Sequence, residues 1–442
     1  MSLPCREKED FEVQQNDILS GESCLYLVQN VKGEGSFGKV ACCLKLDTME
    51  NVAVKIVKKH FTWAGKNEES AFKHICILDL NKSNVVKFLE SFMHRGHMCL
   101  VLEILDTTLH NLMRERGQRP LCVSEIRVIS QQMLVALNAL SSIGLVHTDI
   151  KPDNVMLVNH KLQPFKVKLI DFGLAATVPK MLPGTIQALG YRAPEVILGL
   201  PLDEAVDMWS LGCVLAFMYL GKHLYPTHCE YEGMRVMVQI QGQPSDSLLN
   251  AGLHTKMFFN KKKDSSKQVW RLNTGSEYAL ATGKNTQQSR TKFNRYTCVG
   301  DMTKDHQKPK TVTEHEDTQA FLSLLKRMLC VDSATRIRPV KALRHRFITM
   351  AHFPRDADPD PYVKSSRMHM TVLPPQVVDS PVEIHSFVRS SDGSSADVDD
   401  RPAASGAGNK TRPVPACPNE ANSGFGCILW MTRCFCCVDV IE

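Results

Sequence analysis

The 442-residue sequence contains no apolar run of the ~18 residues that a membrane-spanning helix needs, so we expect no transmembrane segment. Its first residues, MSLPCREKEDFEVQQND, are polar and show no secretory signal, and no internal repeat is visible. Neither sign of charge dominates, because 53 basic and 47 acidic side chains leave a net charge of only +6. Eleven of the sixteen cysteines lie before residue 350, singly in apolar runs, and because no secretory signal precedes them we predict that they are reduced thiols of a cytosolic or nuclear protein.

The composition is otherwise that of a folded protein. Hydrophobic residues make up 43% and charged residues 23%, which argues against collagen, coiled coil and wholesale disorder. The charges are unevenly distributed. Residues 256–310 hold 13 basic and 4 acidic side chains, a net charge of +9, whereas residues 351–442 hold 8 and 12, a net charge of −4. Ten of the 22 prolines lie in the last 92 residues, so we predict that residues 351–442 form a disordered tail.

Two periodicities divide the rest of the chain. After a polar N-terminal segment, residues 1–21, short β-branched and apolar runs up to residue 105 predict strands with one helix. From Ser124, a candidate N-cap, apolar residues recur every three or four positions, which predicts helices. Residues 206–220 are apolar almost all round and predict a buried helix, and two further amphipathic helices are predicted at 319–330 and 339–346.

A glycine motif opens the strand-rich part. Residues 33–40 read GEGSFGKV, the G-x-G-x-x-G-x-V pattern, in which glycines let the backbone approach phosphate oxygens closely. A Rossmann loop has the same spacing but is followed directly by a helix. Here residues 39–46 continue as a strand, which favours a hairpin lying over a nucleotide.

A lysine stands in the next β-branched run, VAVK, at Lys55. Alone it could be an edge-strand charge that prevents aggregation. With the glycine motif upstream, it is predicted to bind phosphate, and such a lysine needs a carboxylate to hold it. Glu68 or Glu69 could supply that carboxylate, and we favour Glu68 because Phe72 then falls one turn further along the same helix.

The run HTDIKPDN carries the residue types of a phosphoryl-transfer loop. Asp149 would accept the proton of a hydroxyl group, Lys151 would neutralise the transferring phosphoryl group, and Asn154 would bind a metal ion. The run DFG follows a strand-like segment and places Asp171 to hold Mg²⁺ between the phosphates. The run APE, which ends at Glu195, closes the segment that begins at Asp171.

In this order and spacing, the motifs resemble the eukaryotic protein kinase family over residues 22–350. Asp207 in DMWSLG matches the buried aspartate that anchors the catalytic loop, and Arg336 matches the arginine that pairs with Glu195. The phrases IKPDNVMLV, PFKVKLIDFG, RAPEVILGLP and AVDMWSLGCV look like the homeodomain-interacting protein kinase branch. The group to which this branch belongs carries an insert between late helices, and residues 254–312 occupy that place.

The resemblance implies an α+β, two-lobed kinase fold with a small β-rich N-lobe and a larger helical C-lobe that carries the insert. It implies a serine/threonine kinase that uses ATP and Mg²⁺, with Asp149 and Lys151 catalytic and with Asn154 and Asp171 on the metal. It also implies that the nucleotide is bound by these residues: Gly33, Glu34, Gly35, Ser36, Phe37, Gly38, Val40, Ala53, Lys55, Glu68, Leu102, Glu103 and Leu105.

Three departures from the family concern the residues that would bind a phosphate on the activation loop. Thr148 replaces the usual arginine, Thr185 stands where the related kinases have a loop tyrosine, and Leu189 replaces the arginine that would bind its phosphate. We hypothesise that the loop is held by packing, through Tyr191, Arg192 and the pair of Glu195 with Arg336, because a phosphate needs arginines to order a segment. The alternative is phosphorylation elsewhere in the loop, at Thr185 or Thr177.

For partners, the resemblance implies protein substrates, with transcription regulators among the candidates, and a nuclear or cytoplasmic location. Direct nucleic-acid binding is not expected. The basic segment 256–310 is either a docking surface, a nuclear-import surface or a contact with nucleic acid or, as we favour, a solvated insert whose aromatic residues pack on the C-lobe. Membrane association would require acylation of the C-terminal cysteines, whose spacing suits zinc poorly. The oligomeric state is left open.

Two rival functions remain at this point. One is a catalytically weak scaffold that uses the kinase fold for binding, which loss of Lys55, Asp149 or Asp171 would have favoured. The other is a phosphotransferase that acts on small molecules, which the APE run and Asp207 argue against.

Overall fold

The computed structural model describes residues 12–182, 186–264, 267–284, 296–306, 309–354 and 360–371. The predictions for Thr185 and for the C-terminal cysteines therefore lie outside the described residues, as does most of the tail 351–442. Within the described ranges, no helix is both long enough and apolar enough to cross a membrane.

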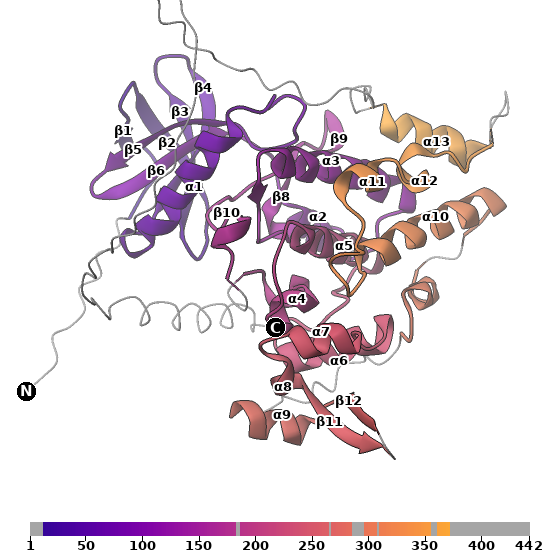
Figure 1. The fold of residues 1–442 in the computed structure, drawn as a ribbon. Helices are drawn as coiled ribbons and strands as arrows, with labels where there is room; N and C mark the ends of the chain where they lie inside the picture. Colours follow the sequence, from indigo (N-terminus) through magenta and orange to yellow (C-terminus); the bar gives the residue numbers. More distant parts are fainter. Residues whose placement is uncertain are drawn as a thin grey trace, which may run out of the picture. The chain divides into compact units, whose positions relative to one another are not determined.

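The N-lobe is one antiparallel sheet with helix α1 packed beside it (Figure 1). The sheet order is β1-β2-β3-β4-β6-β5. The elements are β1 (Ile18–Ser20), β2 (Leu25–Glu34), β3 (Gly38–Lys45), β4 (Glu50–Val57), α1 (Thr62–Ile75), β5 (Phe88–His94) and β6 (His97–Glu103). Alternate residues of β4, namely Val52, Val54 and Ile56, are buried on one face of the sheet. The period of two thus turns Ala53 and Lys55 to the other face.

The first strand begins before residue 22, where the sequence predicts the folded domain to start. Leu19 in β1 is fully buried, and the strand pairs with β2 in register from Ile18↔Leu27 to Ser20↔Leu25. The start of β2 is also bound to β5, at the other edge of the sheet, because the Glu90 side chain accepts hydrogen bonds from Ser23 and Tyr26. The boundary at residue 22 therefore cuts through the N-terminal sheet.

The C-lobe is built around helix α5 (Ala205–Leu220), in which every residue is buried. This agrees with a segment that is apolar almost all round. The helices around it are α2 (Leu109–Glu115), α3 (Val123–Ser142), α4 (Pro194–Leu198), α6 (Glu230–Gln241), α7 (Asp246–Ala251), α10 (Val312–Met328), α11 (Pro339–Leu343) and α12 (Arg346–Thr349). Together the two lobes confirm the predicted α+β class.

Two small antiparallel pairs position the loops that matter for chemistry. Strand β7 (Leu145–Val146) pairs with β10 (Ala176–Thr177), and β8 (Val155–Asn159) pairs with β9 (Gln163–Leu169). Residues 147–154 connect β7 to β8, and Asp171 follows β9 by two residues. The loop 147–154 thus leads into β8, which pairs with β9, the strand that precedes Asp171.

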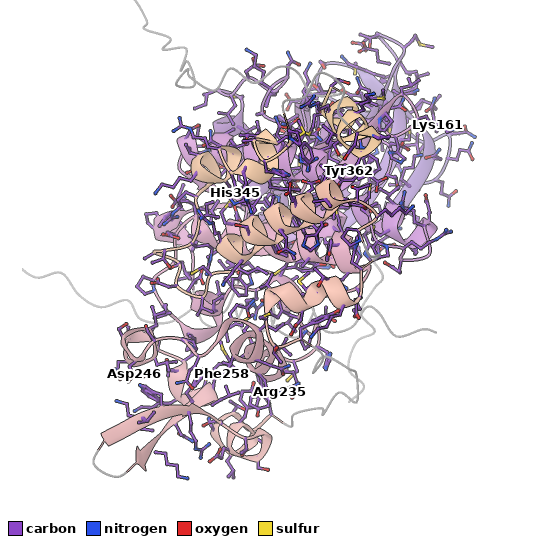
Figure 2. All side chains as sticks on the ribbon, turned by 90° about the vertical axis from the view of Figure 1, so that its right-hand side faces the viewer. Lys161, Arg235, Asp246, Phe258, His345 and Tyr362 are labelled. Atoms are coloured by element: carbon purple, nitrogen blue, oxygen red, sulfur yellow. The ribbon has the colours of Figure 1, made fainter. Side chains whose placement is uncertain are left out.

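The insert forms α8 (Thr255–Phe258), the hairpin of β11 (Phe259–Asp264) and β12 (Lys267–Leu272), and α9 (Gly275–Thr282). Figure 2 shows Phe258 beside this hairpin, in the same part of the molecule as Arg235 and Asp246. Aromatic side chains of the insert are buried, namely Phe258, Phe259, Trp270 and Tyr278. Lys261 lies over the Trp270 ring, with Nζ 4.7 Å from its centroid. Arg290, Lys292, Phe293 and Arg295 lie outside the described residues.

One helix lies inside the segment for which the sequence predicts no packed fold. Helix α13 (Pro361–Met370) contacts α3 and α10, and Val363 and Ser366 on it are buried. Asp360 caps its start by accepting a hydrogen bond from the Val363 amide at 2.8 Å, and Pro361 has the fixed φ that suits a first helical residue. The prediction for 351–442 is therefore wrong at residues 360–371, because local capping and burial outweigh the proline-rich composition.

Candidate active site

Glycine stands at the three positions of the GEGSFGKV motif for different structural reasons. A Cβ atom at Gly38 would overlap the carbonyl oxygen of Ile56 on the neighbouring strand, so the sheet itself requires glycine there. A Cβ at Gly33 would meet nothing within 4 Å, and at Gly35 only the Gly38 carbonyl oxygen at 3.9 Å. The protein's own packing does not require these two glycines, whereas a closely approaching phosphate would.

The sheet face beneath this loop gathers four of the predicted nucleotide contacts. Val40 pairs with Lys55 across β3 and β4, and Ala53 pairs with Leu102 across β4 and β6. Cross-strand partners share a face, so these side chains lie on the side opposite Val52 and Val54.

The side chain of Glu103, at the end of β6, is bound to the protein itself. Its Oε1 atom accepts hydrogen bonds from the Lys87 amide at 2.7 Å and from Lys168 Nζ at 2.5 Å. Because Oε1 is held in this way, we expect the predicted contact of Glu103 with a nucleotide to come from its main chain. Leu105 follows it and is buried.

Lys55 joins the two lobes through two carboxylates. Its Nζ atom lies 2.7 Å from Glu68 Oε2 on α1 and 2.8 Å from Asp171 Oδ1. Glu69, the alternative partner considered from the sequence, instead accepts a hydrogen bond from Ser91 at 2.8 Å and lies 3.1 Å from Lys73. The pair with Glu68 fixes the position of α1 relative to the lysine that is predicted to bind phosphate.

Asp149, Lys151 and Asn154 converge in the loop that follows β7. Lys151 Nζ lies 3.0 Å from Asp149 Oδ2, and Asn154 Nδ2 donates to the Asp149 carbonyl at 2.8 Å and to its Oδ2 at 3.1 Å. Asp207 of α5 holds the start of the loop, because its carboxylate accepts the amides of His147 at 2.7 Å and Thr148 at 2.9 Å. The buried helix thus anchors the catalytic loop, as the resemblance implied.

An aromatic column links the same elements. The ring of Phe172 lies 4.9 Å from that of His147 and 5.5 Å from that of Phe72 on α1. The His147 side chain is hydrogen-bonded to the Ile170 carbonyl at 2.9 Å, and burial lowers the pKa of His147. A neutral imidazole in this packed position suits a structural part rather than a general base.

Burial and neighbouring charges set the ionisation of the site. Burial raises the pKa of Asp149, which the neighbouring Lys151 cation opposes only in part. For Asp171 burial acts in the same direction, but the charge of Lys55 outweighs it and the pKa of Asp171 is lowered. For Lys55, burial acts to lower the pKa, but the charges of Asp171 and Glu68 outweigh it and the pKa is raised. Lys55 therefore stays protonated and Asp171 ionised at neutral pH.

Asn154 and Asp171 supply a donor set that fits Mg²⁺. The side-chain nitrogen of Asn154 donates to Asp149, so its side-chain oxygen points away from Asp149. The main-chain carbonyl of Asn154 accepts the Ile170 amide at 3.0 Å. One carboxylate and one amide oxygen suit Mg²⁺, which takes its remaining ligands from phosphates and water. Among the described residues, no group of three or more His, Cys, Asp or Glu could hold a metal ion by itself. The phosphates would thus complete the site.

The family model described as the protein kinase domain matches residues 26–348 of this chain. The chain belongs to the protein kinase family. The fold, the order of the motifs and the anchoring of the catalytic loop by α5 are those that the sequence resemblance implied.

Curated relatives place this kinase chain near one branch of the family. Homeodomain-interacting protein kinase 1 of Mus musculus is 40% identical over 374 residues, which cover 82% of this chain and 30% of the relative. Homeodomain-interacting protein kinase 2 of Mus musculus is also 40% identical, with 82% and 31% covered. Homeodomain-interacting protein kinase 4 of Homo sapiens is 36% identical over 349 residues, with 75% and 56% covered. The chain thus spans about a third to a half of these relatives, and the resemblance to this branch is confirmed.

The kinase activation segment, residues 171–195, ends in a buried ion pair. Arg336 donates to Glu195 Oε1 at 2.5 Å and to Oε2 at 2.8 Å, and both side chains are fully buried. Breaking such a pair by removing one partner typically costs about 3–5 kcal/mol. The pair therefore ties the end of the segment firmly to the C-lobe.

Arg192 in the same segment is held by an anion that the sequence did not indicate. Its Nη1 atom lies 2.5 Å from Glu230 Oε1 at the start of α6, and its Nε atom donates to the Ile186 and Gln187 carbonyls at 3.1 Å. The Gln187 side chain in turn donates to Ser210 at 2.8 Å. The hypothesis that packing holds the loop stays a prediction, but Arg192 here has a carboxylate for a partner.

Sequence reasoning missed several residues of this site. Asn67, Lys168, Gln187 and Glu230 contact the predicted residues or the activation segment through hydrogen bonds or ion pairs. Asn67, Gln187 and Glu230 stand in none of the quoted motifs, and Lys168 stands in PFKVKLIDFG with no role assigned to it there. Their contacts are to main-chain atoms or to residues far away in the sequence. The one available signal is position, because Asn67 directly precedes Glu68 and Lys168 lies three residues before Asp171.

Proposed function

We propose that the chain is a serine/threonine protein kinase that transfers the γ-phosphoryl group of ATP to hydroxyl groups of proteins. The observation that carries this proposal is the meeting of Lys55, Glu68 and Asp171 within 2.8 Å, beside a loop that presents Asp149, Lys151 and Asn154. A protein that had lost catalysis and kept only binding would have no need for this complete set.

The proposed mechanism relies on positioning and electrostatics. Lys55 contacts the phosphates of ATP and is itself oriented by Glu68. Asp149 accepts the hydrogen bond of the substrate hydroxyl and takes its proton, while Lys151 stabilises charge on the transferring group. Asp171 and Asn154 would hold Mg²⁺, which when bound neutralises charge on the phosphates. Most of the rate gain is expected from this pre-organised arrangement.

The class of substrate and the location are inferred from the names of the relatives. The relatives are named for interaction with homeodomain proteins, so we propose transcription regulators as substrates and the nucleus, with or without the cytoplasm, as the location. Lysine at position 151 supports serine and threonine as acceptors. The basic insert stays a candidate docking surface for acidic partners, and direct nucleic-acid binding is not part of the proposal.

The test is phosphate transfer from ATP to a generic basic protein by the purified full chain. Wild type should transfer phosphate, and Lys55→Met and Asp171→Ala should each lose about 100-fold or more, as expected when one electrostatic contact to the reacting group is removed. Lys73→Met, an exposed lysine on α1, is the matched control and should keep wild-type activity. Transfer that is unchanged in Asp171→Ala would contradict the mechanism.

A phosphoproteomic comparison of cells that carry wild type or Lys55→Met would then identify the substrate class. Sites lost in the variant should be serines and threonines of nuclear proteins. Loss confined to tyrosines would contradict the proposed specificity.

A further inference from the structure

Three consecutive main-chain carbonyls, beginning with that of Gly173 in the DFG run, each accept a hydrogen bond from a side chain of another element. Asn67 Nδ2 on α1 donates to the Gly173 carbonyl and to the Ala175 carbonyl, both at 2.9 Å. Thr148 Oγ1 in the catalytic loop donates to the Leu174 carbonyl between them, at 2.7 Å. The segment 173–175 is thus pinned from both lobes.

The two pinning residues stand directly beside catalytic ones. Asn67 precedes Glu68 and Thr148 precedes Asp149, while the pinned carbonyls begin two residues after Asp171. Glu68 also accepts the Phe172 amide, with Oε1 at 3.3 Å. Any movement that swings α1 away from Lys55, or that turns Asp171 out of the site, would have to break these bonds.

Position 148 is neutral and fully satisfied. Thr148 is fully buried, its amide donates to Asp207, its carbonyl accepts the Gln187 amide at 3.0 Å, and its hydroxyl donates to Leu174. Its φ of 67° is an unusual backbone conformation for a β-branched residue, which persists only where the surroundings over-determine it. An arginine here would need an anion to order the segment, whereas the threonine hydroxyl needs only a carbonyl.

We propose that Asn67 and Thr148 are positioning residues that hold Glu68 and Asp171 in their active arrangement without a phosphate on the activation segment. The inference rests on the proposed function, because it names the groups that keep that same site assembled. The pins act on α1 and on the segment after Asp171, not on the surface that receives a protein substrate.

The first experiment follows amide exchange in the full chain after phosphatase treatment, with no nucleotide added. Thr148→Val keeps the side-chain shape and loses the donor, and Asn67→Leu removes both amide donations. One neutral hydrogen bond corresponds to roughly a fivefold change in an equilibrium. Protection of the peptide that covers residues 171–176 should therefore fall about fivefold in Thr148→Val and up to about 25-fold in Asn67→Leu.

Controls separate a local effect from loss of the fold. Exchange across α5 should stay unchanged in both variants, Thr148→Ser should retain wild-type protection, and Ser70→Ala, one turn further along α1 on its exposed side, should have no effect. Unchanged exchange at residues 171–176 in both Asn67→Leu and Thr148→Val would overturn the proposal.

The second experiment measures phosphate transfer by the same samples. Phosphatase-treated wild type should keep its activity within about twofold, and the variants should lose kcat by up to the same factors as they lose protection, with KM for the protein substrate unchanged. A tenfold loss in wild type on phosphatase treatment would overturn the proposal. If wild type transfers no phosphate in any state, the proposed function fails, and the exchange measurement still decides whether the pins exist.

Discussion

Replacing Tyr362 by phenylalanine tests whether α13 is part of the folded kinase domain. The carboxylate of Asp317, buried inside the C-lobe, is bound by three side chains. Arg127 on α3 donates to it, His352 lies 2.9 Å from Oδ1, and the Tyr362 hydroxyl donates to Oδ2 at 2.6 Å. The last of these bonds joins α13 to the C-lobe, and Figure 2 labels Tyr362 in this region.

The expected loss in the free energy of unfolding follows from the charge and the burial of the hydrogen-bond partners. A hydrogen bond to a charged group contributes about 1.5–3 kcal/mol, and the half-buried Tyr362 points to the lower end, about 1.5 kcal/mol. Asp317→Ala should cost more, about 3–5 kcal/mol, because it leaves the fully buried Arg127 without its carboxylate. Ser365→Ala, on the exposed side of α13, should stay within about 0.5 kcal/mol of wild type.

Equilibrium unfolding in urea, followed by tryptophan fluorescence, measures the three variants against wild type. The midpoints should fall in the order Ser365→Ala, Tyr362→Phe, Asp317→Ala, with the slope m unchanged. If Tyr362→Phe unfolds at the same midpoint as Ser365→Ala, the bond to Asp317 does not hold α13 in solution. The assignment of residues 360–371 to the folded domain would then fail.

Two further predictions concern the active site. Asp149 must be ionised to accept a proton, so kcat/KM should fall as the pH falls through the pKa of Asp149. Burial raises this pKa above the ordinary value of about 3.9, and the charge of Lys151 lowers it. Lys151→Met should therefore move the acid limb of the pH–rate profile to higher pH. A pH–rate profile whose limb does not move would contradict this assignment. Gly38→Ala would overlap the Ile56 carbonyl and should lower stability by about 1–3 kcal/mol, whereas Gly33→Ala should keep the melting temperature and raise KM for ATP. Equal melting temperatures for the two variants would refute the distinction between the glycines.

The parts of the site that chemistry restricts to one residue type could be predicted from the sequence. A phosphate-binding hairpin needs glycine, a base needs a carboxylate, and a metal needs oxygen ligands, so Gly33, Lys55, Asp149 and Asp171 are visible in the sequence as motifs. The structure brings Lys55 and Asp171 together across 116 residues of sequence. Their catalytic roles stay predictions, because geometry alone does not measure transfer.

Helix ends were less predictable than helices, because caps depend on local hydrogen bonds. The helix expected to be capped by Ser124 begins at Val123, where the Cys122 amide donates to Glu125 at 2.8 Å. The single helix expected at 339–346 is divided into α11 and α12, because His345 is extended and caps the second helix through the Phe347 amide. The hydrophobic period is the same on both sides of such a break, so periodicity does not reveal it.

The hydrogen bonds to residues 173–175 show which contacts the sequence could not display when it indicated that packing holds this loop. From the sequence, threonine at position 148 is a missing part, because the residue expected there is a cation whose partner is charged. In the structure the acceptors are main-chain carbonyls, which every residue carries and no sequence pattern displays. Any small donor in reach can serve them, so no motif marks Asn67 or Thr148 for this contact. The absence of an arginine at position 148 therefore shows only that this position does not bind a phosphate. It does not say that the segment is loose, and two neutral side chains can supply the order that a charged switch supplies elsewhere.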